Sequence, residues 1–158
     1  MLIIGNWKAY LGDLKRGKAL LTAYKRLAHT SPHTLVIAPP APFLSLLALR
    51  GGSVRFAAQD VSVTTGGAQT GEVTAQTYAS AGATYALIGH SERRARGDTL
   101  DVVASKLSHA LAHGLTPVLC IGENERDSEG AYLSLIREQI TSAFGVLMPK
   151  ERRAVIIA

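Results

Sequence analysis

The chain has 158 residues, of which 47% are hydrophobic and 18% are charged, and its formal net charge is +5. This length suffices for one domain with its own core, and the composition is that of an ordinary globular protein. No apolar run approaches the roughly 18 residues of a membrane span, and the one cysteine, Cys120, excludes an intrachain disulfide.

The first residues, "MLIIGNWK", lack the basic region and apolar core of a signal peptide, so we expect a cytoplasmic protein. Cys120 lies within an apolar run and is interpreted as a small buried hydrophobe. The positive charge suits an anionic ligand. Because the basic residues near the N-terminus are not interleaved with aromatic ones, we expect no nucleic-acid partner, and we expect no membrane partner either.

Short apolar runs alternate with helical patterns along the whole chain. Apolar runs of four or five residues that lack polar alternation are typical of strands buried on both faces. The expected strands cover residues 2–5, 34–38, 54–58, 85–88, 117–121 and 154–158.

Amphipathic stretches between these runs predict helices. The first begins after Asp13, a favourable N-cap, and ends before Ser31 and Pro32. The second is short and follows Pro42, and the third covers residues 74–81. The fourth runs from about residue 98 to Gly114, and the fifth surrounds residues 132–143. The apolar residues expected to share one face of the first helix are Leu14, Leu20, Leu21, Tyr24, Leu27 and Ala28.

Five βα units and a sixth strand predict a parallel sheet with right-handed crossovers. The length favours a complete, doubly wound open sheet of the flavodoxin type. A βα barrel normally needs about 250 residues for its eight units. The pattern of elements leaves both architectures open.

Polar and ionisable residues follow directly after several of these strands. In both architectures ligands bind beyond the carboxyl ends of the strands. A cation, an amide, an imidazole and a carboxylate at one rim can bind a small anion and polarise a carbonyl group. The residues in question are Asn6 and Lys8 after the first run, Gln59 after the third, His90, Ser91, Glu92 and Arg93 after the fourth, and Glu123 after the fifth.

Several common motifs fail on inspection. The loop at residues 66–71 has P-loop spacing, but Glu72 stands where a P-loop requires lysine. No G-x-G-x-x-G follows the first strand, and "GHSER" is not a nucleophile elbow. His109 and His113 have the spacing of a zinc pair without its glutamate, so we interpret them as surface histidines near a helix C-terminus.

His90 precedes Ser91 and Glu92, which are placed to form the first turn of a short helix. The positive end of a helix dipole disfavours a charged imidazole. We therefore expect His90 to be neutral and to act as a hydrogen-bond donor.

Four segments carry a more specific pattern. They are "GNWK" at residues 5–8, "GAQTGEV" at 67–73, "IGHSERR" at 88–94 and "CIGE" at 120–123. In order and spacing they resemble the triosephosphate isomerase family, and the resemblance runs from residue 2 to residue 158. It implies an α/β fold that is an incomplete (β/α)8 TIM barrel, with strands 1–6 and five intervening helices, in place of the open sheet.

The resemblance implies an isomerase of glycolysis and gluconeogenesis. Such an enzyme interconverts dihydroxyacetone phosphate and glyceraldehyde 3-phosphate through an enediolate, without cofactor or metal. Lys8 would face the substrate phosphate and the developing oxyanion, with Asn6 beside it. His90 would be the neutral electrophile that polarises the carbonyl, a role already known for this family. The supporting residues would be Glu92, which would hold Lys8 in place, Ser91 and Glu123.

A homo-oligomer is also implied by the resemblance. Thr70, at the tip of the third loop, would reach into a neighbouring subunit. Glu72 and Arg93 would pair across that interface, and Gln59 would support the same region. Gln69 stands where the family usually has an aromatic residue, which reduces the apolar area that the loop tip can bury.

In the family, the strand that matches residues 154–158 continues into the catalytic glutamate, a mobile lid and two further strands. We therefore expect residues 1–158 to form a single N-terminal portion of a barrel that is inactive alone. The expected partners are triose phosphate or inorganic phosphate, and a second copy or a complementary C-terminal fragment that covers the exposed strand edges. The alternative is a non-catalytic phosphate-binding or self-assembling barrel fragment.

Overall fold

The computed structural model describes residues 1–123, 125–126 and 128–158. These residues form one sheet of six strands, which lie side by side in chain order and are parallel throughout. The predicted parallel sheet is thereby confirmed. Its strands are β1 (Leu2–Asn6), β2 (Thr34–Ala38), β3 (Arg55–Ala58), β4 (Tyr85–Ile88), β5 (Thr116–Leu119) and β6 (Ile156–Ile157).

All five expected helices are present. Two four-residue helices accompany them: α4, which contains the expected turn after His90, and α7, which the sequence does not predict. Asp13 caps α1 as expected, because its side chain accepts a hydrogen bond from the backbone N–H of Arg16. The helices are α1 (Leu14–Thr30), α2 (Ala41–Ala48), α3 (Ala75–Ser80), α4 (Ser91–Arg94), α5 (Leu100–Ala112), α6 (Ala131–Gly145) and α7 (Pro149–Arg152).

The last strand is shorter than its apolar run. Residues 154–158 are expected to be extended, but β6 covers only Ile156–Ile157. Ala154 belongs to the turn after α7, where its N–H donates to the carbonyl of Glu151. Pairing nevertheless continues to the end of the chain, since the N–H of Ala158 donates to the carbonyl of Leu119.

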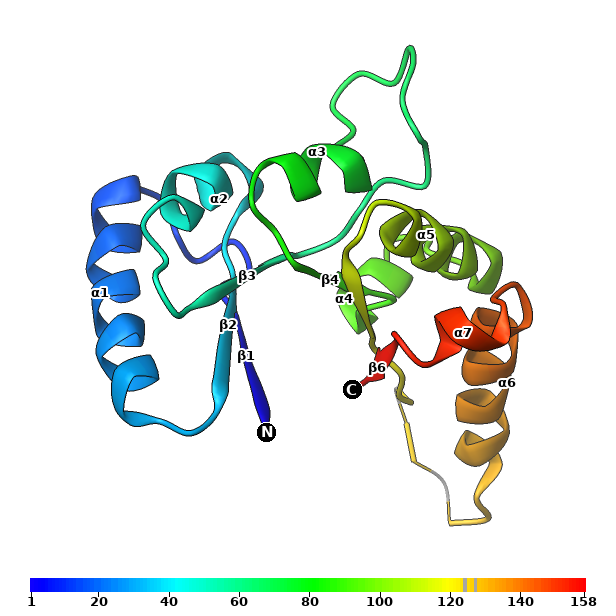
Figure 1. Cartoon of the computed structure of the whole chain (residues 1–158). Coiled ribbons are helices and arrows are strands. Elements are labelled where there is room, and N and C mark those ends of the chain that lie inside the picture. Colours follow the sequence, from blue (N-terminus) through cyan, green and yellow to red (C-terminus); the bar gives the residue numbers. More distant parts are fainter. Residues whose placement is uncertain (124, 127) are drawn as a thin grey trace.

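The sheet curls into a half-barrel. Figure 1 shows it curving from α1 and α2 on one side to α5 and α6 on the other, with β1 and β6 at its two ends. Within the described residues β1 pairs only with β2, and β6 only with β5. The sheet is therefore open, and each end strand has one unpaired edge.

Alternate residues of each strand face opposite sides of the sheet. On the outer side, Ile37 packs in a cluster with Leu21 and Leu47 from α1 and α2. Ile88 packs in a second cluster with Leu107 of α5. A third cluster consists of strand residues that face inward, namely Val36, Ala38, Ala57, Leu87 and Val118, with Leu2, Ile4, Tyr85 and Ile156 partly buried against them.

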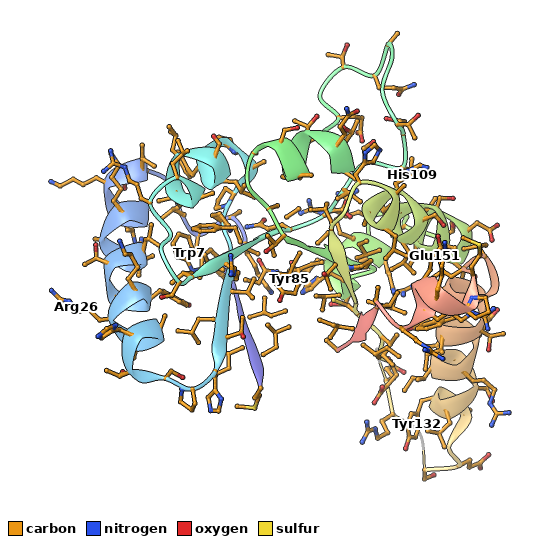
Figure 2. All side chains as sticks on the ribbon, viewed as in Figure 1. Trp7, Arg26, Tyr85, His109, Tyr132 and Glu151 are labelled. Atoms are coloured by element: carbon orange, nitrogen blue, oxygen red, sulfur yellow. The ribbon has the colours of Figure 1, made fainter. Side chains whose placement is uncertain are left out.

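The contact between α1 and the sheet is narrower than the apolar face of the helix. Leu21 is 3% exposed, whereas Leu20 is 37% and Leu27 is 59% exposed. The expectation that all the leucines share the buried face is therefore wrong for Leu20 and Leu27. Both side chains are exposed on the surface of α1, and Arg26 of the same helix points away from the body of the protein (Figure 2).

Adjacent leucines on α1 test this assignment. We expect Leu21→Ala to lower the free energy of unfolding by about 2–5 kcal/mol, since it leaves a cavity beneath the helix. Leu20→Ala should change it by less than about 1 kcal/mol, because the side chain already contacts water. Urea unfolding of the two variants measures the difference, and equal losses would contradict the assignment.

Candidate active site

Parallel pairing brings the carboxyl ends of β1, β3 and β4 to one rim of the half-barrel. A groove of about 550 Å³ lies there. Among its lining residues are six of those predicted from the sequence: Asn6, Lys8, Gln59, His90, Glu92 and Arg93.

Lys8 has a left-handed backbone conformation, with φ of 47°. Such a conformation is strained for a lysine and needs support from its surroundings. Its N–H donates to Asn6 Oδ1 at 2.9 Å, and its carbonyl accepts from Gln59 Nε2 at 2.9 Å. Gln59 also donates to the carbonyl of Ala38 at 2.9 Å, so it links Lys8, the second residue after β1, to the end of β2.

The Lys8 ammonium is directed by Glu92. Its Nζ lies 2.8 Å from Glu92 Oε1, and both side chains are substantially exposed. This hydrogen bond raises the pKa of Lys8 and lowers the pKa of Glu92. The cation and the carboxylate therefore both stay charged over a wide pH range.

His90 forms the N-cap of α4. Its Nδ1 accepts a hydrogen bond from the backbone N–H of Glu92 at 3.2 Å. A ring nitrogen that accepts carries no proton, so this contact assigns the proton to Nε2. Glu92 Oε2 lies 3.7 Å from the same Nδ1, but an ion pair there would require Nδ1 to be protonated. We assign the acceptor role because the backbone contact is shorter.

Gly89 makes the sharp turn from β4 into α4 possible. Its φ is +73°, and a Cβ at this position would lie 2.8 Å from Arg94 Nη2. Arg94 donates from Nε to the Gly89 carbonyl at 2.7 Å and from Nη2 to the Cys120 carbonyl at 3.3 Å. The turn that carries His90 is thus joined to the end of β5.

A cluster of four charged residues extends from the lining of the groove into the protein interior, and we call it the buried charge cluster: Asp60, Arg93, Asp98 and Lys106. Lys106 is only 2% exposed, and its Nζ contacts Asp60 at 2.8 Å and Asp98 at 2.7 Å. Arg93 Nε lies 2.8 Å from Asp60. Burial raises the pKa of Asp60 against the opposing effect of Lys106, and it raises the pKa of the neighbouring Tyr78 to about 12.

Sequence reasoning overlooked Lys106. A signal was present, because residue 106 shares a helix face with Val103 and Ala110, three residues before it and four after it. A lysine within an apolar stripe needs a buried partner. Only the tertiary structure shows that its partners come from the loop after β3 and from the segment before α5.

A second cavity, of about 630 Å³, lies on the other side of His90 and includes Ser91, Cys120 and Glu123 in its lining. Glu123 therefore does not face the Lys8 groove. It accepts a hydrogen bond from Arg126 Nε at 2.8 Å, which lowers the pKa of its carboxyl. Cys120, interpreted from the sequence as a small buried hydrophobe, is partly buried.

Of the four residues predicted to form an interface, Gln59 and Arg93 line the groove that contains Lys8, whereas Thr70 and Glu72 do not. Thr70 and Glu72 are exposed on the long loop between β3 and α3, which extends away from the body of the protein (Figure 1). Among the described residues Glu72 forms no ion pair, while Arg93 pairs with Asp60 inside the chain. A Glu72–Arg93 pair across an interface stays a prediction.

The described residues contain no group of three or more His, Cys, Asp or Glu that could hold a metal ion. None of their helices has both the length and the apolar character needed to cross a membrane. His109 lies on α5, and His113 is its C-cap (Figure 2).

Comparisons with known proteins agree on one family. The model of the triosephosphate isomerase family matches residues 1–158. The triosephosphate isomerase of Cupriavidus necator is 38% identical over 161 residues, which cover 99% of this chain and 64% of the relative. The triosephosphate isomerase of Bordetella pertussis is 41% identical over 144 residues, which cover 88% of this chain and 57% of the relative. The chain thus spans less than two thirds of the length of these relatives and matches their N-terminal portion.

The Lys8–Glu92 pair predicts a pH dependence of stability. Lys8→Met removes the pair and should lower the unfolding free energy near neutral pH. Because pairing lowers the pKa of Glu92 and raises that of Lys8, its contribution is present between the ordinary values of 4.5 and 10.5. It is lost as acid protonates Glu92 or as base deprotonates Lys8. Urea unfolding across pH should show the difference between wild type and K8M vanishing at both extremes.

Lys15→Met is the matched control, because Lys15 is exposed and forms no ion pair among the described residues. It should show no such pH dependence. A constant difference between K8M and wild type down to strong acid would contradict the pairing.

The turn at Gly89 gives a second test. Gly89→Ala introduces a Cβ into a left-handed, crowded position and should cost about 1–3 kcal/mol of stability. At Gly12 a Cβ meets no atom within 4 Å, so Gly12→Ala should leave stability unchanged or raise it by about 0.4–1 kcal/mol. Urea unfolding separates the two, and a neutral G89A would show that the turn tolerates a side chain.

Proposed function

The chain belongs to the triosephosphate isomerase family. We propose that its groove supplies the cation and the hydrogen-bond donor of a site that interconverts dihydroxyacetone phosphate and glyceraldehyde 3-phosphate. This reaction moves a proton between adjacent carbon atoms through an enediolate. It needs a cation near the phosphate, a donor to the oxygen where negative charge develops, and a base. The proposed reaction is a step of glycolysis and gluconeogenesis, and we expect it to take place in the cytoplasm.

The observation that carries the proposal is the hydrogen bond from the Glu92 N–H to His90 Nδ1. It leaves Nε2 as the donor of a neutral imidazole at the groove. A donor aimed at a carbonyl oxygen stabilises the enediolate more than the ground state, because the oxygen becomes more negative as the proton leaves carbon. Polarisation of the carbonyl by a neutral histidine is the role known for the family.

Lys8 supplies the cation. Its ammonium is held by one contact to Glu92 and keeps further N–H groups for a substrate phosphate or oxyanion. Asn6 lies beside it and fixes its backbone through the 2.9 Å contact to the Lys8 N–H. We assign Lys8 to substrate binding and charge stabilisation, and Asn6 to support of Lys8 and contact with substrate.

The described residues offer no unpaired carboxylate at the groove that could act as the base. Among the described residues, every carboxylate that lines the two cavities is already paired with a cation: Asp60 with Arg93 and Lys106, Glu92 with Lys8, Asp98 with Lys106, and Glu123 with Arg126. A paired carboxylate is a weak base. We therefore propose that the carboxylate that moves the proton comes from a complementary C-terminal fragment, which would also cover the free edges of β1 and β6.

Complementation tests this proposal. The 158-residue chain is mixed with the C-terminal third of the Cupriavidus necator enzyme, and isomerase turnover is measured. We expect turnover from the mixture and, from the chain alone, a rate lower by at least about 10²–10⁴-fold, the usual contribution of a positioned acid or base. Turnover by the chain alone at the rate of the full-length relative would overturn the proposal.

Two variants locate the site within the active mixture. His90→Gln should lower kcat by about 10²–10³-fold, as the loss of one oxyanion donor does in other enzymes. Lys15→Met, on the exposed face of α1, should leave kcat unchanged. If the wild-type mixture binds inorganic phosphate at Lys8 without any turnover, the non-catalytic phosphate-binding module replaces the isomerase as the function.

A further inference from the structure

Lys106 is the most deeply buried charged side chain among the described residues. It lies on α5, which packs against the outer side of the sheet, and it is 2% exposed. Its Nζ contacts Asp60 Oδ1 at 3.0 Å, Asp60 Oδ2 at 2.8 Å and Asp98 Oδ2 at 2.7 Å. A buried ammonium is expensive unless it is fully paired, and here three hydrogen bonds pair it.

The buried charge cluster is electrically balanced, with two cations and two carboxylates. Arg93 completes it as an ion pair, with Nε 2.8 Å from Asp60 and Nη2 3.5 Å from Asp98, although the Nε–H does not have hydrogen-bond geometry toward any acceptor of the described residues. Exposure increases from one end to the other, since the side chain of Lys106 is 3% and that of Arg93 is 41% exposed. The cluster therefore runs from the protein interior to the edge of the groove.

Two pairs of adjacent residues connect this cluster to Lys8. Gln59, which donates to the Lys8 carbonyl, directly precedes Asp60. Glu92, which binds the Lys8 ammonium, directly precedes Arg93. The Asp60–Arg93 contact links these two pairs. Lys8, Gln59, Asp60, Arg93 and Glu92 thus form a continuous ring of bonded and contacting residues.

The Lys8 ammonium depends on this ring of residues because its direct ion pair with Glu92 is weak. Its pair with Glu92 is exposed on both sides, and such pairs contribute little to holding a geometry. Glu92 lies on α4, a single turn of four residues that is too short to be stable by itself. The position of α4 therefore depends on side-chain contacts such as those of Arg93.

We propose that Lys106 is a positioning residue for the Lys8 ammonium, acting through Asp60 and Arg93 on Glu92. Lys106 touches neither the groove nor a bound molecule. It holds Asp60, which directly follows Gln59 and pairs with Arg93 next to Glu92, so it acts on two of the three contacts of Lys8. Its importance for catalysis rests on the proposed function, whereas its effect on Lys8 does not.

Competitive amine labelling of the 158-residue chain, read by peptide mass spectrometry, reports on Lys8 without any turnover. The Glu92 pair protects Lys8 because it raises the pKa of the ammonium. We expect Lys106→Met to accelerate labelling of Lys8 roughly two- to five-fold, the range expected for loss of an exposed ion pair. Lys15 in the same sample is the internal reference, and Lys150→Met, at an exposed site on α7, is the control that should change nothing.

A double-mutant comparison distinguishes positioning from a merely structural role. Glu92→Gln should accelerate labelling of Lys8 to the same extent, and K106M combined with E92Q should add nothing further, because both act on one contact. Lys106→Arg, which keeps the charge, should restore much of the protection. Additive effects of K106M and E92Q would overturn the proposal.

Asp60→Asn provides a variant that leaves Lys106 its Asp98 partner if K106M fails to fold. It breaks the link between the two residue pairs and should also accelerate labelling of Lys8. Unchanged Lys8 labelling in folded D60N, together with faster labelling in E92Q, would overturn the proposal. Absence of turnover in the wild-type mixture would instead overturn the proposed function and leave the labelling result standing.

Discussion

Parallel pairing of the strands in chain order is the constraint on which the rest of this structure depends. It sends every carboxyl end to the same rim, so residues that are far apart in the chain meet there. Asn6 and His90 are separated by more than half the chain, yet they line one groove. The same pairing places the longer helices between successive strands, where α1, α2 and α5 pack on the outer side of the sheet.

The curled sheet has two different faces, and they explain why the arrangement is incomplete in itself. Helices bury the outer face, where Ile37, Ile88 and Leu119 are fully covered. On the inner face the central residues are buried by one another, but Leu2, Ile4 and Ile156 at the two ends are only partly covered. The described strands thus leave apolar surface and backbone hydrogen-bonding groups along the edges of β1 and β6.

The charged residues at the rim differ in how deeply they are buried. The outermost pair, Lys8 and Glu92, is exposed and weak by itself. The innermost residue, Lys106, is buried and donates three hydrogen bonds to two carboxylates. Asp60 and Arg93 connect them. This gradient combines a solvent-accessible cation with a charged core that cannot rearrange cheaply, which suits a site that holds a lysine in a strained backbone conformation.

Residue patterns in the sequence alone determined the six strands, the five longer helices, the turn at His90 and six residues that line the groove, because local periodicity, capping and buried apolar runs depend on near neighbours. They did not determine which flank of α1 is buried, the length of β6, or the partners of Lys106. Those depend on which elements pack against one another, and a salt link such as Asp60–Lys106 joins residues 46 positions apart. Only the tertiary structure brings such charges together, since burial in a shared core is what makes their pairing obligatory.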